Sequence, residues 1–104
     1  MYARITSVPI QPGKTEAVIK LIQDSVAPVL QHQAGFKGWY LLTDSVKNKI
    51  MSITLWETEA DLKEGQFSPA YQEQIAKLSS LAAGPPAIEQ YNISYTFLNG
   101  GIVP

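Results

Sequence analysis

The sequence lacks cysteine altogether, which excludes disulfides, thiolate catalysis and cysteine-ligated metal sites. It also has little charge: 16% of residues are charged, and eight basic and nine acidic side chains give a net charge of −1. The basic residues are spread from Arg4 to Lys77 without a cluster, so no nucleic-acid partner is indicated. No apolar run approaches the roughly 18 residues of a membrane span, and residues 1–4 lack a signal-peptide pattern. We therefore expect no membrane association, and a cytoplasmic location is the default expectation.

The length of 104 residues suits one domain, which we expect over residues 1–97, with residues 98–104 as a C-terminal tail. A domain of this size buries roughly 65% of the surface that its unfolded chain exposes. Association with a second copy would bury more, so a homodimer is the expected assembly. The tail contains two glycines and is expected to need a partner to be ordered.

Four stretches have the alternation and the β-branched or aromatic content of β-strands. The predicted strands are residues 2–8, 36–43, 49–56 and 87–97. The third has two distinct faces, with Met51, Ile53 and Leu55 on one and Ser52, Thr54 and Trp56 on the other. Because a short polar loop joins the second strand to the third, these two are predicted to form an antiparallel hairpin.

Two helical regions separate these strands. Apolar residues recur at three- and four-residue spacing from Val18 to Leu30, which predicts a helix packed on the sheet. Pro28 predicts a kink or break about one turn earlier. Gly35 is expected to end the helical region in the left-handed conformation. Thr58 is the expected cap of a second helix running to Gly65. Ser68-Pro69 then restarts helix, which residues 83–86, Ala-Gly-Pro-Pro, end.

The resulting order is strand, helix, strand, strand, helix, strand. Two right-handed crossovers in this order give an α+β fold of the ferredoxin-like βαββαβ kind, a four-stranded antiparallel sheet with the helices on one face. The second and third strands are apolar on both sides. We therefore expect a second sheet to cover the face that the helices leave bare.

Three short motifs stand at corresponding places in this order. They are Ile10-Gln11-Pro12-Gly13-Lys14, Gln33-Ala34-Gly35-Phe36-Lys37-Gly38-Trp39 and Leu55-Trp56-Glu57-Thr58-Glu59-Ala60, with Ser68-Pro69 downstream. Over about residues 2–97 the chain resembles the antibiotic biosynthesis monooxygenase (ABM) family of the dimeric α+β barrel superfamily. Residues 81–86 also look like the ending of the family's small aromatic-polyketide oxygenases.

The resemblance implies a homodimer whose two sheets face each other, with a pocket for a small aromatic or apolar ligand between sheet and helices in each subunit. It also implies a monooxygenase-like oxidation of phenolic, quinol or polyketide-type substrates by O₂ with no cofactor, neither metal nor flavin. Such chemistry needs hydrogen-bond donors that stabilise a substrate anion in a dry pocket.

Trp56 is the candidate catalytic residue, since its indole can line the pocket, donate a hydrogen bond and stack on an aromatic substrate. The alternative is that Trp56 packs at the strand end. In phenol-oxidising members an asparagine stands four residues before this tryptophan and a tyrosine six after it. Ser52 and Leu62 occupy these positions; serine keeps a donor and leucine does not.

A second branch of the family degrades haem with an asparagine, a tryptophan and a histidine. The matching positions here hold Thr6, Gly65 and Ile75. Without an axial histidine the iron has no ligand from that site, so haem degradation is disfavoured.

The remaining candidates are polar or aromatic. Arg4 and Tyr40 are predicted substrate contacts beside Ser52, because arginine can clamp a carboxylate, phenolate or quinone oxygen. The alternative for Arg4 is a salt bridge at the sheet edge or across the dimer. His32 is read as an exposed residue near the last helical carbonyls. The acidic residues 57–64 are read as a helix start, with no metal site. The alternative function is a non-catalytic dimeric module that binds a small ligand or serves a pathway enzyme.

Overall fold

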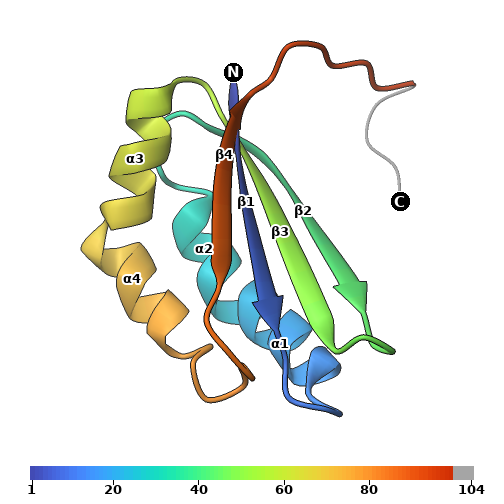
Figure 1. Ribbon diagram of the computed structural model, residues 1–104. Helices are drawn as coiled ribbons and strands as arrows, with labels where there is room; N and C mark the ends of the chain where they lie inside the picture. The colour runs from blue at the N-terminus through green and yellow to red at the C-terminus, as the bar shows by residue number, and fades with distance from the viewer. Residues whose placement is uncertain (100–104) are drawn as a thin grey trace.

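The computed structural model describes residues 1–99 of the chain. Its elements are β1 (Tyr2–Pro9), α1 (Thr15–Leu21), a π-helical turn η1 (Ile22–Val26), α2 (Ala27–Leu30), β2 (Phe36–Asp44), β3 (Lys49–Trp56), α3 (Glu59–Phe67), α4 (Pro69–Ala76) and β4 (Ala87–Asn92). One sheet layer has all the helices on one side (Figure 1). The predicted ferredoxin-like fold is confirmed.

The sheet has the strand order β2-β3-β1-β4, and every neighbouring pair is antiparallel. The loop between β2 and β3 turns tightly because the backbone N–H groups of Lys47 and Val46 donate to Asp44 Oδ1, each at 3.0 Å. These donors lower the pKa of the Asp44 carboxyl below its usual value. Asn48, at φ 53°, completes the turn in the left-handed region. The predicted hairpin is therefore confirmed.

The first helical region is broken where Pro28 predicts. Proline has no N–H to donate, so the regular ladder fails one turn before it, and the chain forms η1 between α1 and α2. The Ala27 N–H donates to the carbonyl of Ile22 there. Gly35, at φ 75°, then reverses the chain into β2. A side chain at this position would also collide with the Asp61 carboxylate.

The second helical region confirms both predicted caps. Thr58 Oγ1 accepts the Asp61 N–H at the start of α3, and Ser68 Oγ accepts the Tyr71 N–H at the start of α4. Helix α3 runs to Phe67, two residues beyond the predicted Gly65.

Two further elements are shorter than predicted. Helix α4 ends at Ala76, because the chain after it turns to hydrogen-bond the end of β1, with Leu81 O accepting the Gln11 N–H at 3.0 Å. Strand β4 ends at Asn92 and not at residue 97. Its partner β1 begins at Tyr2, which pairs with Asn92, so little backbone remains to pair with later residues. The predicted tail falls partly on residues 100–104, which lie outside the described residues.

The two faces of the sheet differ sharply. On β3, Ile50, Thr54 and Trp56 are buried toward the helices. Val18, Ile22, Val26, Leu30 and Leu62 pack with them to form the core. The opposite face has no helix over it (Figure 1). Among residues 1–99, no helix has both the length and the apolar character needed to cross a membrane.

Candidate functional site

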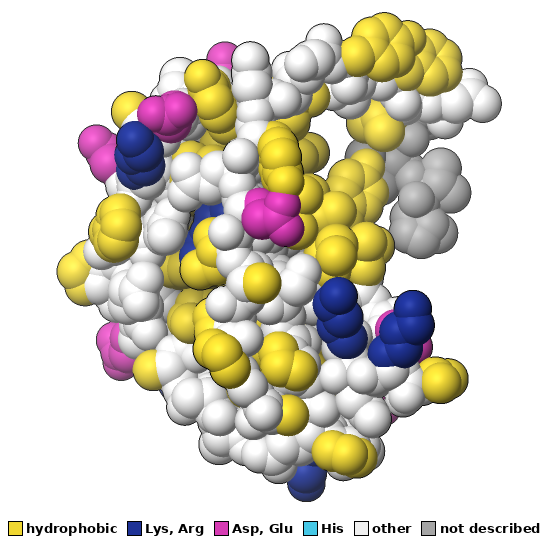
Figure 2. Space-filling model, in the orientation of Figure 1, with side chains coloured by type: hydrophobic (Ala, Val, Ile, Leu, Met, Phe, Trp, Pro, Cys, Tyr) yellow, Lys and Arg dark blue, Asp and Glu magenta, His cyan; other side chains and the backbone are white. Residues whose placement is uncertain are grey.

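A cavity of about 610 Å³ lies between the sheet and the helices. Figure 2 shows the surface hollowed between β4 and the helices, with hydrophobic side chains visible inside. The lining residues come from all four strands and from the helical layer: Arg4, Thr6, Val8, Ile10, Ile22, Val26, Trp39, Ile50, Ser52, Gln66, Tyr71, Gln72, Ile75, Leu78, Ser79, Ala82, Gly84, Pro85, Pro86 and Ile88. The volume suits a small organic ligand.

The lining is polar at one end and apolar at the other. Arg4 stands near the start of β1, and Gln66 and Tyr71 reach the same end from α3 and α4. Val8 and Ile10 lie farther along the chain, where Ile10 bridges to Ala82. A ligand in this cavity would therefore have one polar end and an apolar body.

Arg4 is the only charged residue in the lining. It is 8% exposed, and its Nη1 donates to Tyr71 Oη at 3.2 Å. The guanidinium carbon also lies 5.8 Å from the centre of the Tyr71 ring. Within residues 1–99 no carboxylate forms a salt bridge with Arg4, so the predicted alternative of a salt bridge at the sheet edge has no partner there.

Ser52 lines the middle of the cavity beside Trp39. Its Oγ accepts the Trp39 indole N–H at 2.7 Å. That bond fixes the Trp39 ring in the wall and leaves the Ser52 hydroxyl hydrogen free to donate to a ligand. This part of the site therefore presents an aromatic surface next to a hydrogen-bond donor.

Trp56 lies in the core and not in the lining. It is 1% exposed, and its indole N–H donates to Thr54 Oγ1 at 2.9 Å. Its ring packs edge-on against Phe36, with the centroids 5.4 Å apart. Gly65 of α3 lies directly against the same ring, and a Cβ there would come within 2.7 Å of Trp56 Cζ3. Glycine at this position is therefore what allows the ring to fit.

The other sequence candidates lie elsewhere. Tyr40 pairs with Ile53 on the sheet face away from the helices, while its neighbour Trp39 lines the cavity. His32 is exposed, with Nδ1 2.7 Å from the Pro28 carbonyl oxygen, as its helix-end position predicts. Of the four residues predicted for the site, the structure brings Arg4 and Ser52 together in one cavity. Tyr71 joins them; its helical spacing fits an apolar stripe, and the sequence leaves open whether its ring lines a pocket or a dimer interface.

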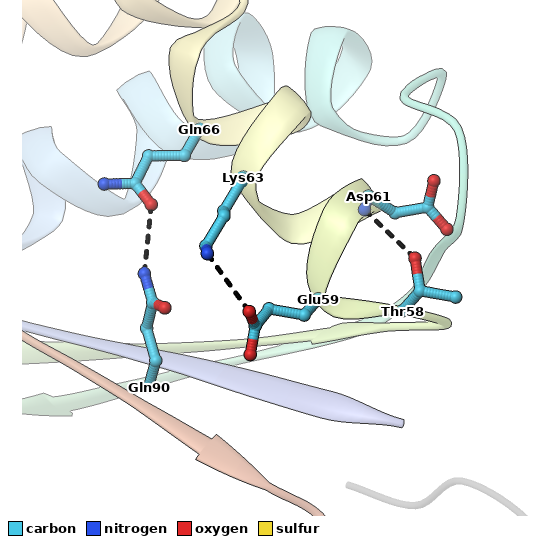
Figure 3. Close-up of polar contacts among 6 residues, drawn as sticks. All are labelled: Thr58, Glu59, Asp61, Lys63, Gln66 and Gln90. Atoms are coloured by element: carbon cyan, nitrogen blue, oxygen red, sulfur yellow. Dashed lines mark hydrogen bonds and ion pairs between the residues drawn. The ribbon is translucent and has the colours of Figure 1, made fainter.

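One end of the cavity is bordered by a link between the helices and the edge strand. Gln90 Nε2 on β4 donates to Gln66 Oε1 on α3 at 3.2 Å (Figure 3). Gln66 belongs to the lining, so the position of α3 bears directly on the site. The same view shows the Thr58 cap and the exposed Lys63–Glu59 ion pair, which hold the start of this helix.

Replacing Thr58 by alanine should lower the free energy of unfolding by about 1 kcal/mol. The change removes the oxygen that accepts the Asp61 N–H at the start of α3. Urea unfolding followed by circular dichroism measures the loss. The control is Thr96→Ala, because Thr96 is exposed and follows β4. Equal stabilities for the two variants would contradict a capping role.

Comparison with known proteins gives one family. Residues 1–77 match the family model described as antibiotic biosynthesis monooxygenase. Two Mycobacterium tuberculosis proteins, the uncharacterized proteins MT2635 and Rv2558, are each 29% identical to the chain over 98 residues, which is 90% of the chain. The chain spans 39% of the length of each of these relatives.

Solved structures resemble the fold. A monooxygenase from the gene ActVA-Orf6 of Streptomyces coelicolor, in complex with nanaomycin D, superposes with a TM-score of 0.81 at 18% identity, covering 95% of this chain and 92% of that one. SnoaB, a cofactor-independent oxygenase from Streptomyces nogalater, gives a TM-score of 0.77 at 14% identity, covering 94% and 97%. At these identities the likeness concerns the fold.

Proposed function

The chain belongs to the antibiotic biosynthesis monooxygenase family, and we propose that it is a cofactor-independent monooxygenase acting on an aromatic, quinol or polyketide-type small molecule. The observation that supports this most directly is the cavity. It is largely apolar, has an indole and a hydroxyl side by side in its wall, and has one cation at its end. These are the features that anion-forming aromatic substrates need.

The proposed reaction converts a ring CH₂ group of an anthrone-type substrate to a carbonyl. One oxygen atom of O₂ enters the product, and the other leaves as water with the two hydrogens of the CH₂ group. The substrate anion donates the electrons, so no metal or flavin is required. Among the lining residues, none is Asp, Glu, His or Lys, so the substrate itself must ionise readily.

We assign substrate contacts to two of the predicted residues. Ser52 donates to the oxygen on which negative charge develops, and Arg4 binds the substrate at the polar end of the cavity. Trp56 acts as a positioning residue, because its N–H holds Thr54, whose Oγ1 lies 3.5 Å from the Arg4 carbonyl oxygen. Tyr40 has no part in this assignment, since it lies on the other face of the sheet.

Ser52→Ala should lower kcat for anthrone or quinol oxidation by about 10- to 100-fold, the effect of losing one hydrogen bond to a charged group. Oxygen consumption and ¹⁸O incorporation from ¹⁸O₂ measure the rate and the origin of the new oxygen. The matched control is Ser7→Ala, because Ser7 is on β1 but pairs with Met51 on the opposite face. No turnover above buffer by the wild-type protein across both substrate classes would refute the proposal.

The second candidate function is a non-catalytic dimeric module that binds a small ligand. The lack of a carboxylate, imidazole or amine in the lining favours it, because no side chain there is suited to remove a proton at neutral pH. Mass spectrometry of co-purified small molecules, before and after aerobic incubation, separates the two. A ligand recovered unchanged supports binding, and an oxidised one supports catalysis.

We also propose that the protein is a homodimer, as the family resemblance implies. The face of the sheet away from the helices is rich in apolar and aromatic side chains, and two of them, Leu42 and Tyr91, are about half exposed. Tyr40 and Ile53 lie together on this face. A second copy seated face to face would remove this apolar surface from water.

A further inference from the structure

We propose that the ligand of this cavity is an apolar monocarboxylic acid. Its carboxylate would be held by Arg4 and Tyr71, and its apolar body would extend toward Val8 and Ile10. The inference names the ligand class for the cavity and rests on the proposed function only in taking this cavity as the binding site. The carboxylate anchors the ligand and does not react.

The first argument is charge. Arginine keeps its positive charge in proteins, and burying a charge is costly unless it is paired. Arg4 is only 8% exposed, yet within residues 1–99 no carboxylate forms a salt bridge with it. No other lining residue is charged. The cavity therefore has an uncompensated positive charge, which one anionic group would neutralise.

The second argument is incomplete hydrogen bonding. The guanidinium makes one hydrogen bond within the described chain, from Nη1 to Tyr71 Oη, and its buried Nε has no acceptor there. Tyr71 Oη accepts that bond, and the hydrogen of the Tyr71 hydroxyl has no acceptor among residues 1–99. Nη1 and Oη are 3.2 Å apart. Two donors so close, one of them cationic, are suited to the two oxygens of a carboxylate.

The third argument is the shape of the cavity. Arg4 and Val8 lie on the same face of β1, four residues apart, which is about 13 Å along a strand. Val8 pairs with Ile50, and Ile10 and Leu78 also line the cavity, so this part of the lining is mainly apolar, with Ser79 as a polar member. A ligand that fills both ends is therefore an acid with an apolar body of two or three fused rings or an equivalent chain. A dianion such as a phosphate monoester would leave one charge unmatched.

The test compares an acid with its neutral counterpart on the full chain. Isothermal titration calorimetry at neutral pH measures naphthalene-2-carboxylate and naphthalene-2-carboxamide binding to wild type, Arg4→Met, Tyr71→Phe and Tyr95→Phe. Tyr95→Phe is the matched control, because Tyr95 is 83% exposed beyond β4. Since Arg4 has no counter-charge, Arg4→Met is expected to remain folded, and retained amide binding verifies this.

We expect wild type and Tyr95→Phe to bind the acid about 10- to 100-fold more tightly than the amide. Arg4→Met should abolish this preference, and Tyr71→Phe should reduce it, with little change in amide affinity. Equal acid and amide affinities in the wild-type protein would overturn the inference without reference to any variant. So would an unchanged preference in a folded Arg4→Met protein.

Failure of this inference is distinguishable from failure of the proposed function. If the acid binds through Arg4 and no substrate consumes O₂, the inference stands and the monooxygenase proposal fails. If quinols turn over while the acid shows no advantage over the amide, the reverse holds. The calorimetric measurement needs no turnover, so each result is obtained independently of the other.

Discussion

Trp56→Ala should lower the free energy of unfolding by about 3–5 kcal/mol, the range for removing a fully buried aromatic side chain. Three separate contacts are lost together. The ring packs edge-on against Phe36, its surface is fitted to Gly65, and its N–H satisfies Thr54 Oγ1 at 2.9 Å. The resulting cavity cannot close easily, because α3 is held at its start by the Thr58 cap. Guanidinium unfolding followed by circular dichroism measures the change.

Trp39→Ala is the matched control for this prediction. Its indole N–H also bonds a β3 hydroxyl, Ser52 Oγ, but its ring is only partly buried and lines the cavity. Its removal should therefore cost clearly less stability while weakening the binding of aromatic ligands. A Trp56→Ala protein as stable as Trp39→Ala would contradict the assignment of Trp56 to the core.

The site predictions from sequence depended on which face of a strand each residue occupies. Alternation placed Ser52, Thr54 and Trp56 on one face of β3, and the structure agrees. On β2, alternation counted from Phe36 would put Tyr40 on the cavity face, but the register shifts between Phe36 and Gly38. Such a bulge exchanges the two faces of the strand beyond it. Trp39 therefore lines the cavity, and Tyr40 lies on the opposite face.

The face of the sheet on which a residue lies was easier to predict than its position along the strand relative to the cavity. Trp56 shares a face with Ser52 but lies at the end of β3, beneath α3, and nothing local to the sequence shows where the cavity stops. The spacing of Tyr71 with Ile75 and Leu78 is that of a packed helix, and the sequence alone leaves open whether its ring lines a pocket or a dimer interface. Its hydroxyl meets Arg4, which is 67 positions away in the chain. Only the fold brings these two residues together.

Ile53→Lys should convert a dimer into monomers. Ile53 pairs with Ile5 and Tyr40 at the centre of the sheet face that the helices leave uncovered. In a single chain, a lysine there can extend into water. Between two facing sheets it would be buried without a counter-charge, at a cost of about 3 kcal/mol or more, which raises the dissociation constant by more than about 100-fold.

Sedimentation equilibrium checks this prediction, with the wild-type protein expected at twice the chain mass of 11.4 kDa and Ile53→Lys at that mass. Val46→Lys is the control, because Val46 is 90% exposed in the loop between β2 and β3 and also exchanges an apolar residue for lysine. It should sediment as the wild type does. A wild-type protein at the monomer mass, or a dimer that persists in Ile53→Lys, would contradict face-to-face assembly. The cavity lies on the helix side of the sheet, so monomeric Ile53→Lys should still bind the ligand. The monomer should be less stable to unfolding than the dimer, because its sheet face is not covered by a second copy.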